Sequence, residues 1–107
     1  SVDCGQPTTL DKTCSIADGL LPVRPGDLTF AHVRAFVDEL ITVEDEALAR
    51  AMSWLFHRTK LVVEPSGAAT VAAFQGRTTQ RDSLTVVILS GGNITLSDMQ
   101  TLSRLEN

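Results

Sequence analysis

The expected architecture follows from Leu84-Thr85-Val86-Val87-Ile88-Leu89-Ser90-Gly91-Gly92-Asn93, an apolar run that leads into a glycine turn. A continuous run of this length, rich in β-branched residues, predicts a strand that is buried on both faces, as in a parallel sheet. The turn then lies at the carboxyl end of the strand, where open α/β sheets bind ligands. Glycine lets the backbone approach a ligand closely, and the Ser90 hydroxyl offers a hydrogen bond. The same tetrapeptide also suits a plain strand-to-helix turn, so both interpretations stay open.

Size and charge limit the class of protein. The chain has 107 residues, enough for one small domain, and a net charge of -4. Its lysines and arginines are scattered, which argues against a nucleic-acid partner. No stretch approaches the roughly 20 apolar residues that span a membrane. Residues 1–20 lack the pattern of a secretion signal, so we expect a cytoplasmic protein with no membrane partner.

The two cysteines, Cys4 and Cys14, stand ten residues apart in a polar segment. They could form a disulfide, but free thiols are favoured in an acidic chain of otherwise ordinary composition. No second cysteine pair or histidine pair accompanies them, so the sequence predicts no metal site.

The first part of the chain predicts loops around one helix. Ser1–Ser15 is polar and indicates an extended surface segment, and Ala17-Asp18-Gly19 forms a turn. Thr29 is a candidate cap for a helix whose apolar stripe covers Phe30–Leu40. Ile41–Val43 is a short strand candidate.

The second part predicts three more helices. Glu44–Lys60 is the clearest of them, with acidic residues in its first turn and basic residues in its last. Glu64 stands just before Pro65–Gly76, a helix of very small residues in which proline suits the first position and glycine the end. Thr95–Asp98 fits a capping box ahead of an apolar stripe that reaches Leu105.

Five short stretches, taken in order, resemble the C-terminal part of the serine/threonine dehydratases and serine racemases. These are pyridoxal-phosphate (PLP) enzymes of the tryptophan-synthase β fold. The matching stretches are Ser15–Gly19, Arg24–Gly26, Val37–Leu40, Thr59–Ala69 and Leu89–Asn93. The resemblance implies an α/β fold in which residues 1–107 form a single partial domain. That domain is an incomplete part of the three-layer, fold-type-II large domain.

The resemblance also implies which residues lie at the cofactor. Ser90 matches the serine that faces the pyridine nitrogen of PLP, with Gly91 in the same turn, and Gly19 and Glu64 match positions near the ring. A hydroxyl is too weak an acid to protonate that nitrogen, so the ring is a weaker electron sink than it is beside an aspartate. A weaker sink suits prompt β-elimination of water.

The chain departs from the family in what it lacks. Lys12 and Lys60 are its only lysines, and neither stands in the Ser-x-x-Lys motif that holds the cofactor covalently. The family's phosphate-binding glycine loop, its substrate-carboxylate loop and its metal carboxylates also match nothing here. We therefore expect no catalytic residue in this chain.

Three functions fit these observations. In the first, the chain is the C-terminal portion of a PLP-dependent lyase that acts on serine, threonine or a similar hydroxy amino acid. This portion is active only with the N-terminal half, and serine racemisation is an alternative activity. In the second, the chain is an inactive remnant that serves as an interaction module. In the third, it binds a small ligand at the Ser90 turn without PLP. The apolar surfaces of Leu84–Leu89 and Pro65–Gly76 predict contact with the N-terminal half or with a second copy.

Overall fold

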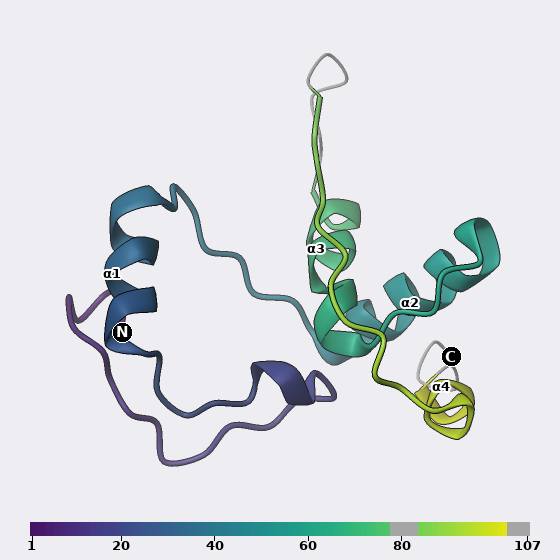
Figure 1. The fold of residues 1–107 in the computed structure, drawn as a ribbon, viewed down its shortest axis with the longest axis horizontal. Coiled ribbons are helices and arrows are strands. Elements are labelled where there is room, and N and C mark those ends of the chain that lie inside the picture. Colours follow the sequence, from purple (N-terminus) through teal and green to yellow (C-terminus); the bar gives the residue numbers. More distant parts are fainter. Residues whose placement is uncertain (78–83, 103–107) are drawn as a thin grey trace.

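The computed structural model describes residues 1–77 and 84–102 (Figure 1). In chain order the elements are a short 3-10 helix η1 (Asp18–Leu20) and the α-helices α1 (Asp27–Phe36), α2 (Asp45–Thr59), α3 (Pro65–Gln75) and α4 (Leu96–Leu102). These two ranges hold no β-strand, so the expected α/β layering is not seen in them. The position of Leu105, expected to continue the last apolar stripe, lies outside the described residues.

A small apolar core lies between α2 and α3 and beside η1. Its side chains come mostly from the facing stripes of the two helices: Ala17, Leu48, Ala51, Met52, Leu55, Val63, Ala68, Val71 and Ala72. The small residues of α3 let the helix approach α2 closely, and Ala51 and Ala68 are completely buried. The stretch of small residues recognised in the sequence therefore serves helix packing.

The rest of the chain is loosely arranged around this core. The radius of gyration is 15.1 Å, whereas a compact domain of this length has about 13 Å. Figure 1 shows α1 standing apart from α2, α3 and α4, at the end of two long connecting segments. Large apolar side chains such as Leu28, Phe36 and Leu40 are exposed. The chain thus presents more apolar surface than a self-contained domain would.

The ends of the later helices confirm the sequence prediction. Helix α2 begins after Glu44 and ends before Lys60, with acidic and basic residues in its first and last turns. Pro65 takes the first turn of α3 and Gly76 caps its end. The capping box before α4 is present, because the Asp98 N–H donates to the Thr95 hydroxyl oxygen at 3.1 Å. Local end signals were sufficient to place these helices.

The start and end of α1 differ from the prediction. The helix begins at Asp27 with Gly26 as its cap. The Thr29 hydroxyl lies inside the first turn and donates to the Gly26 carbonyl at 2.8 Å. Arg24 pairs with Asp27 at 2.6 Å, which adds an ionic contact at the true start. The helix ends at Phe36 rather than Leu40, because Val37 is already extended.

The prediction that Leu84–Leu89 is buried on both faces is wrong for this chain. The segment is extended, but Leu84, Val86 and Ile88 are exposed, and Leu89 alone among its residues packs against the core. A strand needs neighbouring strands to pair its N–H and C=O groups, and the described residues supply none. The same reason applies to Ile41–Val43, which is also extended without being a strand.

The end of α2 generates a stability prediction. Lys60 adopts the left-handed conformation, with φ 61° and ψ 20°, which costs a residue with a Cβ about 1–2 kcal/mol. Its amine donates to the His57 carbonyl at 2.9 Å. The Lys60→Gly and Lys60→Ala variants both lose this bond, and only alanine keeps the Cβ. We therefore expect Lys60→Gly to be more stable than Lys60→Ala by about 1 kcal/mol.

Urea unfolding followed by circular dichroism measures this difference. The matched control is the pair Lys12→Gly and Lys12→Ala, because Lys12 is exposed and does not have a positive φ. Glycine should give no advantage over alanine at that position. Equal unfolding midpoints for the two Lys60 variants would contradict the prediction.

Candidate functional site

Segments that are far apart in the sequence meet at the first turn of α3. The Gly19 N–H, from η1, donates to the Ser66 hydroxyl oxygen at 3.0 Å. From the other side, the Gly91 carbonyl accepts a hydrogen bond from the Glu64 N–H at 3.3 Å. Ser90 precedes Gly91 in the same turn. All four residues singled out in the sequence, Gly19, Glu64, Ser90 and Gly91, thus lie around the start of one helix.

Two glycines make this approach possible. A Cβ on Gly67 would lie 1.8 Å from the Ser90 carbonyl oxygen, so the backbone of the turn rests directly on α3. A Cβ on Gly91 would lie 1.8 Å from Oε1 of Glu64, and Gly91 also has φ +85°. The Ser90 backbone excludes a side chain at Gly67, and the positive φ makes a side chain at Gly91 strained. Gly67, which the sequence indicated only as part of a small helix surface, is the residue on which the Ser90 turn sits.

The site presents two polar groups that the protein leaves available. The Ser90 side chain is exposed, and its hydroxyl makes no hydrogen bond with any other described residue. The Glu64 carboxylate is half-buried against Gly91 and likewise has no hydrogen-bond partner in the described ranges. A hydroxyl can donate or accept, whereas an ionised carboxylate only accepts. The turn can therefore offer a ligand one donor beside a negative charge.

Asp45 holds the η1 side of the site, a role that the sequence did not indicate. Its carboxylate accepts hydrogen bonds from the Ser15 hydroxyl at 2.5 Å and from the Ile16 N–H at 3.2 Å. The Ser15 oxygen in turn accepts the Ala17 N–H at 3.1 Å, next to η1. The sequence showed only that an acid suits the first turn of α2. No local pattern links Asp45 with a segment that lies 30 residues upstream.

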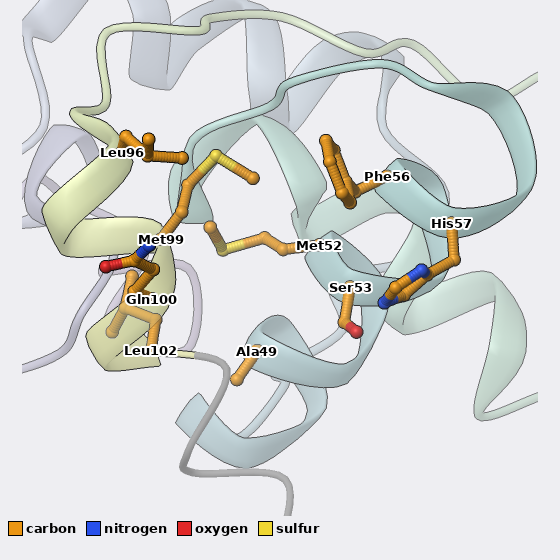
Figure 2. Close-up of a pocket in the computed structure, with 9 residues that line it drawn as sticks. All are labelled: Ala49, Met52, Ser53, Phe56, His57, Leu96, Met99, Gln100 and Leu102. Carbon is orange, nitrogen blue, oxygen red and sulfur yellow. The ribbon is translucent and has the colours of Figure 1, made fainter.

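Two hollows lie near the last helix. One, of about 280 Å³, is beside the site and is lined by residues that include Asp18, Pro65 and Asn93. The other, of about 260 Å³, lies between α2 and α4. Figure 2 shows Met52 and Met99 facing each other across it, and none of the four predicted site residues lines it.

His57, at the edge of the second hollow, is exposed and stacks edge-on against Phe56 at 5.6 Å between ring centroids. Across residues 1–77 and 84–102, no three histidine, cysteine or acidic side chains group closely enough to hold a metal ion. In the same ranges, no helix is both long and apolar enough to cross a membrane.

The contact between the Ser90 turn and α3 generates a second prediction. In the Gly67→Ala variant the new methyl group would overlap the Ser90 carbonyl, so the turn must move. We expect a loss of about 1–3 kcal/mol in the free energy of unfolding. The matched control is Gly76→Ala, because a Cβ there meets its nearest neighbours at 3.6 and 3.7 Å. That variant should be neutral or slightly stabilising.

Thermal and urea unfolding compare the two glycine variants. Chemical shifts of the Ser90 and Gly91 amides report whether the turn has moved. Unchanged stability and unchanged amide shifts in Gly67→Ala would contradict the close contact.

Comparison with known proteins places this arrangement in a family. The family model described as pyridoxal-phosphate dependent enzyme matches residues 1–91. An L-threonine ammonia-lyase from Geobacter sulfurreducens is 41% identical over 96% of this chain and 25% of its own length. A serine racemase from rice, Oryza sativa, is 41% identical over 86% of this chain and 29% of its own length.

A solved structure gives the same result. A threonine deaminase from T.th. superposes with a TM-score of 0.81 and 38% identity, over 89% of this chain and 32% of the deaminase. The described helices and loops therefore follow the fold of that enzyme. The chain spans only about a quarter to a third of the length of these relatives. Because the family model covers most of the chain, the protein belongs to the pyridoxal-phosphate-dependent enzyme family.

Proposed function

We propose that residues 1–107 are a single partial domain, the C-terminal portion of a PLP-dependent lyase. The lyase eliminates water from serine, threonine or a similar β-hydroxy amino acid, and water then hydrolyses the resulting imine, which releases ammonia and leaves a 2-oxo acid. The observation that carries this proposal is the meeting of Gly19, Glu64 and the Ser90–Gly91 turn at the start of α3. The names of the relatives, threonine ammonia-lyase and threonine deaminase, support the reaction.

The residues present fit one wall of a PLP site. The cofactor, when bound, supplies an electron sink for the bond-breaking step. The Ser90 hydroxyl is exposed and has no partner among the described residues, so it can hydrogen-bond a ring nitrogen. Because a hydroxyl is a weak acid, it leaves that nitrogen unprotonated. Glu64 and the bare backbone of Gly91 and Gly19 complete this wall without adding bulk.

The chain holds no lysine in a position to bind the cofactor covalently. Lys12 lies in the exposed N-terminal loop, and the Lys60 amine already donates to the His57 carbonyl. We therefore propose that activity and PLP binding need the N-terminal portion of the enzyme. The chain covers only 25% of the length of the Geobacter lyase, which supports this proposal. Cys4 and Cys14 are both free and exposed, which suits the reducing conditions of the cytoplasm.

Serine racemisation is a second candidate function. The observation in its favour is that a rice serine racemase is as similar in sequence, at 41% identity, as the Geobacter lyase. Both reactions begin by removing the α-proton and differ in whether the hydroxyl then leaves. The wall that this chain supplies is compatible with either outcome.

Reconstitution tests the proposed function. The chain is mixed with a separately produced N-terminal portion of the Geobacter lyase, the part that precedes the matched region. We expect PLP to absorb visible light as a lysine adduct only in the mixture, and the mixture to release a 2-oxo acid from threonine or serine. Chiral analysis of unreacted serine separates elimination from racemisation.

The control for reconstitution is the chain alone with PLP and borohydride, which should yield no specific lysine adduct. A single stoichiometric adduct on Lys12 or Lys60 would overturn the proposal that the N-terminal portion is required. A mixture that forms a complex but never turns over would instead favour the inactive remnant.

Ser90 gives the next prediction in the reconstituted enzyme. Ser90→Ala loses one hydrogen bond to the cofactor, so PLP binding should weaken about fivefold, or roughly 1 kcal/mol. Ser90→Asp should protonate the ring and change the ratio of elimination to side reactions. The control is Ser97→Ala, an exposed position on α4. Unchanged binding and product ratios in both Ser90 variants would refute the role of the hydroxyl.

A further inference from the structure

Asp45 is the first residue of α2, and both of its carboxylate oxygens bind groups outside its own helix. Oδ1 accepts a hydrogen bond from the Ser15 hydroxyl at 2.5 Å, and Oδ2 accepts one from the Ile16 N–H at 3.2 Å. An acid that served only the helix would be stabilised by the helix dipole without any fixed partner. The two contacts therefore indicate a second role for Asp45, which is to hold a segment that lies 30 residues upstream.

The backbone that Asp45 holds is ordered as far as Gly19. The Ser15 oxygen accepts a hydrogen bond from the Ala17 N–H at 3.1 Å, and Ala17 is buried in the apolar core. The Ala17 carbonyl in turn accepts a hydrogen bond from the Leu20 N–H at 2.9 Å, which closes η1 around Gly19. Because the backbone between Ser15 and Gly19 has little freedom, a shift at Ser15 also displaces Gly19.

The contact between Gly19 and α3 leaves little room for such a displacement. The Gly19 N–H donates to the Ser66 hydroxyl oxygen at 3.0 Å, and a Cβ on Gly19 would lie 2.7 Å from the same oxygen. Ser66 lies in the first turn of α3, two residues after Glu64. A small movement of Gly19 would therefore break its hydrogen bond or push Ser66 aside. This side of the site thus depends on where the Ser15–Gly19 segment is held.

We propose that Asp45 is a positioning residue of the site. It holds the Ser15–Gly19 segment, fixes where Gly19 stands against Ser66, and so raises the affinity of the site for its ligand. A group that must first be brought into place costs part of the binding free energy, whereas a group that is already in place does not. The inference rests on the proposed function for the identity of that ligand, which is PLP.

Two variants of Asp45 separate its hydrogen bonds from its charge. Asp45→Ala removes both contacts. Asp45→Asn removes the charge and can keep both contacts, because its oxygen can accept the Ile16 N–H while its amide donates to the Ser15 oxygen. The matched control is Glu46→Ala, which removes an exposed acid from the same turn of α2. The Glu46 carboxylate has no hydrogen-bond partner among residues 1–77 and 84–102.

Hydrogen exchange of the Gly19 amide tests the proposal without the cofactor. The chain is mixed with the N-terminal portion of the Geobacter lyase, and no PLP is added. In Asp45→Ala this amide should exchange about tenfold faster than in the native mixture, because its hydrogen bond to Ser66 opens more often. Asp45→Asn and Glu46→Ala should exchange at close to the native rate. An unchanged exchange rate in Asp45→Ala would overturn the proposal.

Titration with PLP measures the affinity of the same mixtures. Asp45→Ala should weaken PLP binding about tenfold. Asp45→Asn should restore most of the affinity, and Glu46→Ala should bind as the native chain does. Ser15→Ala should also weaken binding, and its effect together with Asp45→Ala should be smaller than the sum of the two, since both remove the same contact. If Asp45→Asn bound as weakly as Asp45→Ala, the hydrogen bonds would not matter and the proposal would be wrong.

A general loss of stability would give a different pattern. Phe30→Ala removes a buried side chain from α1, which stands apart from the site (Figure 1). This variant should lower the free energy of unfolding and still bind PLP as the native chain does. Binding as weak as that of Asp45→Ala would assign the effect to stability and refute the positioning role. A native mixture that binds no PLP would contradict the proposed function, whereas the exchange rate of the Gly19 amide would still decide whether Asp45 positions Gly19.

Discussion

The Ser90 backbone is seated on the first turn of α3, and the arrangement of the site follows from this contact. It exists because Gly67 has no side chain at the point where the Ser90 carbonyl arrives. The same contact brings Gly91 against Glu64, which stands just before the helix. A glycine turn and a helix start that lie more than twenty residues apart thus become a single site. The backbone of the Ser90–Gly91 turn is thus held in place by its contacts with α3 and Glu64.

Hydrogen bonds also hold the other side of the site in place. Asp45 at the start of α2 holds Ser15 and Ile16, and Gly19 then binds Ser66 at the start of α3. The two helices pack against each other through the apolar core, which sets the distance between their first turns. The segment Ser15–Gly19 thus contacts the first turn of α2 and the first turn of α3. The position of Gly19 therefore depends on the α2–α3 packing as much as on its own turn.

The sequence predicted well those features that local chemistry controls. Helix α3 begins at a proline and ends at a glycine, and the Thr95–Asp98 box precedes α4 as expected. It failed where the outcome depends on distant partners. The apolar run of Leu84–Leu89 indicated burial, but burial of a strand requires neighbours that the described residues do not contain. Asp45 was understood as a helix-terminal acid, because its partners lie far upstream. The Ser90 turn was singled out from the apolar run that precedes it, whereas Gly19 and Glu64, and the expected place of all four residues at a cofactor, came from the family resemblance and not from periodicity.

The order of the extended segment Leu84–Leu89 affects the order of the site, because Ser90 follows Leu89 directly. An extended segment with unpaired backbone groups is held at one end only, here by Leu89 in the core and by Thr70 at Ile88. A neighbouring strand that pairs with this segment also restrains the chain that leads into the Ser90 turn. A strand partner thus lowers the entropic cost of fixing the hydroxyl at its ligand. A neighbouring strand beside this segment should therefore also raise the affinity of the Ser90 turn for its ligand.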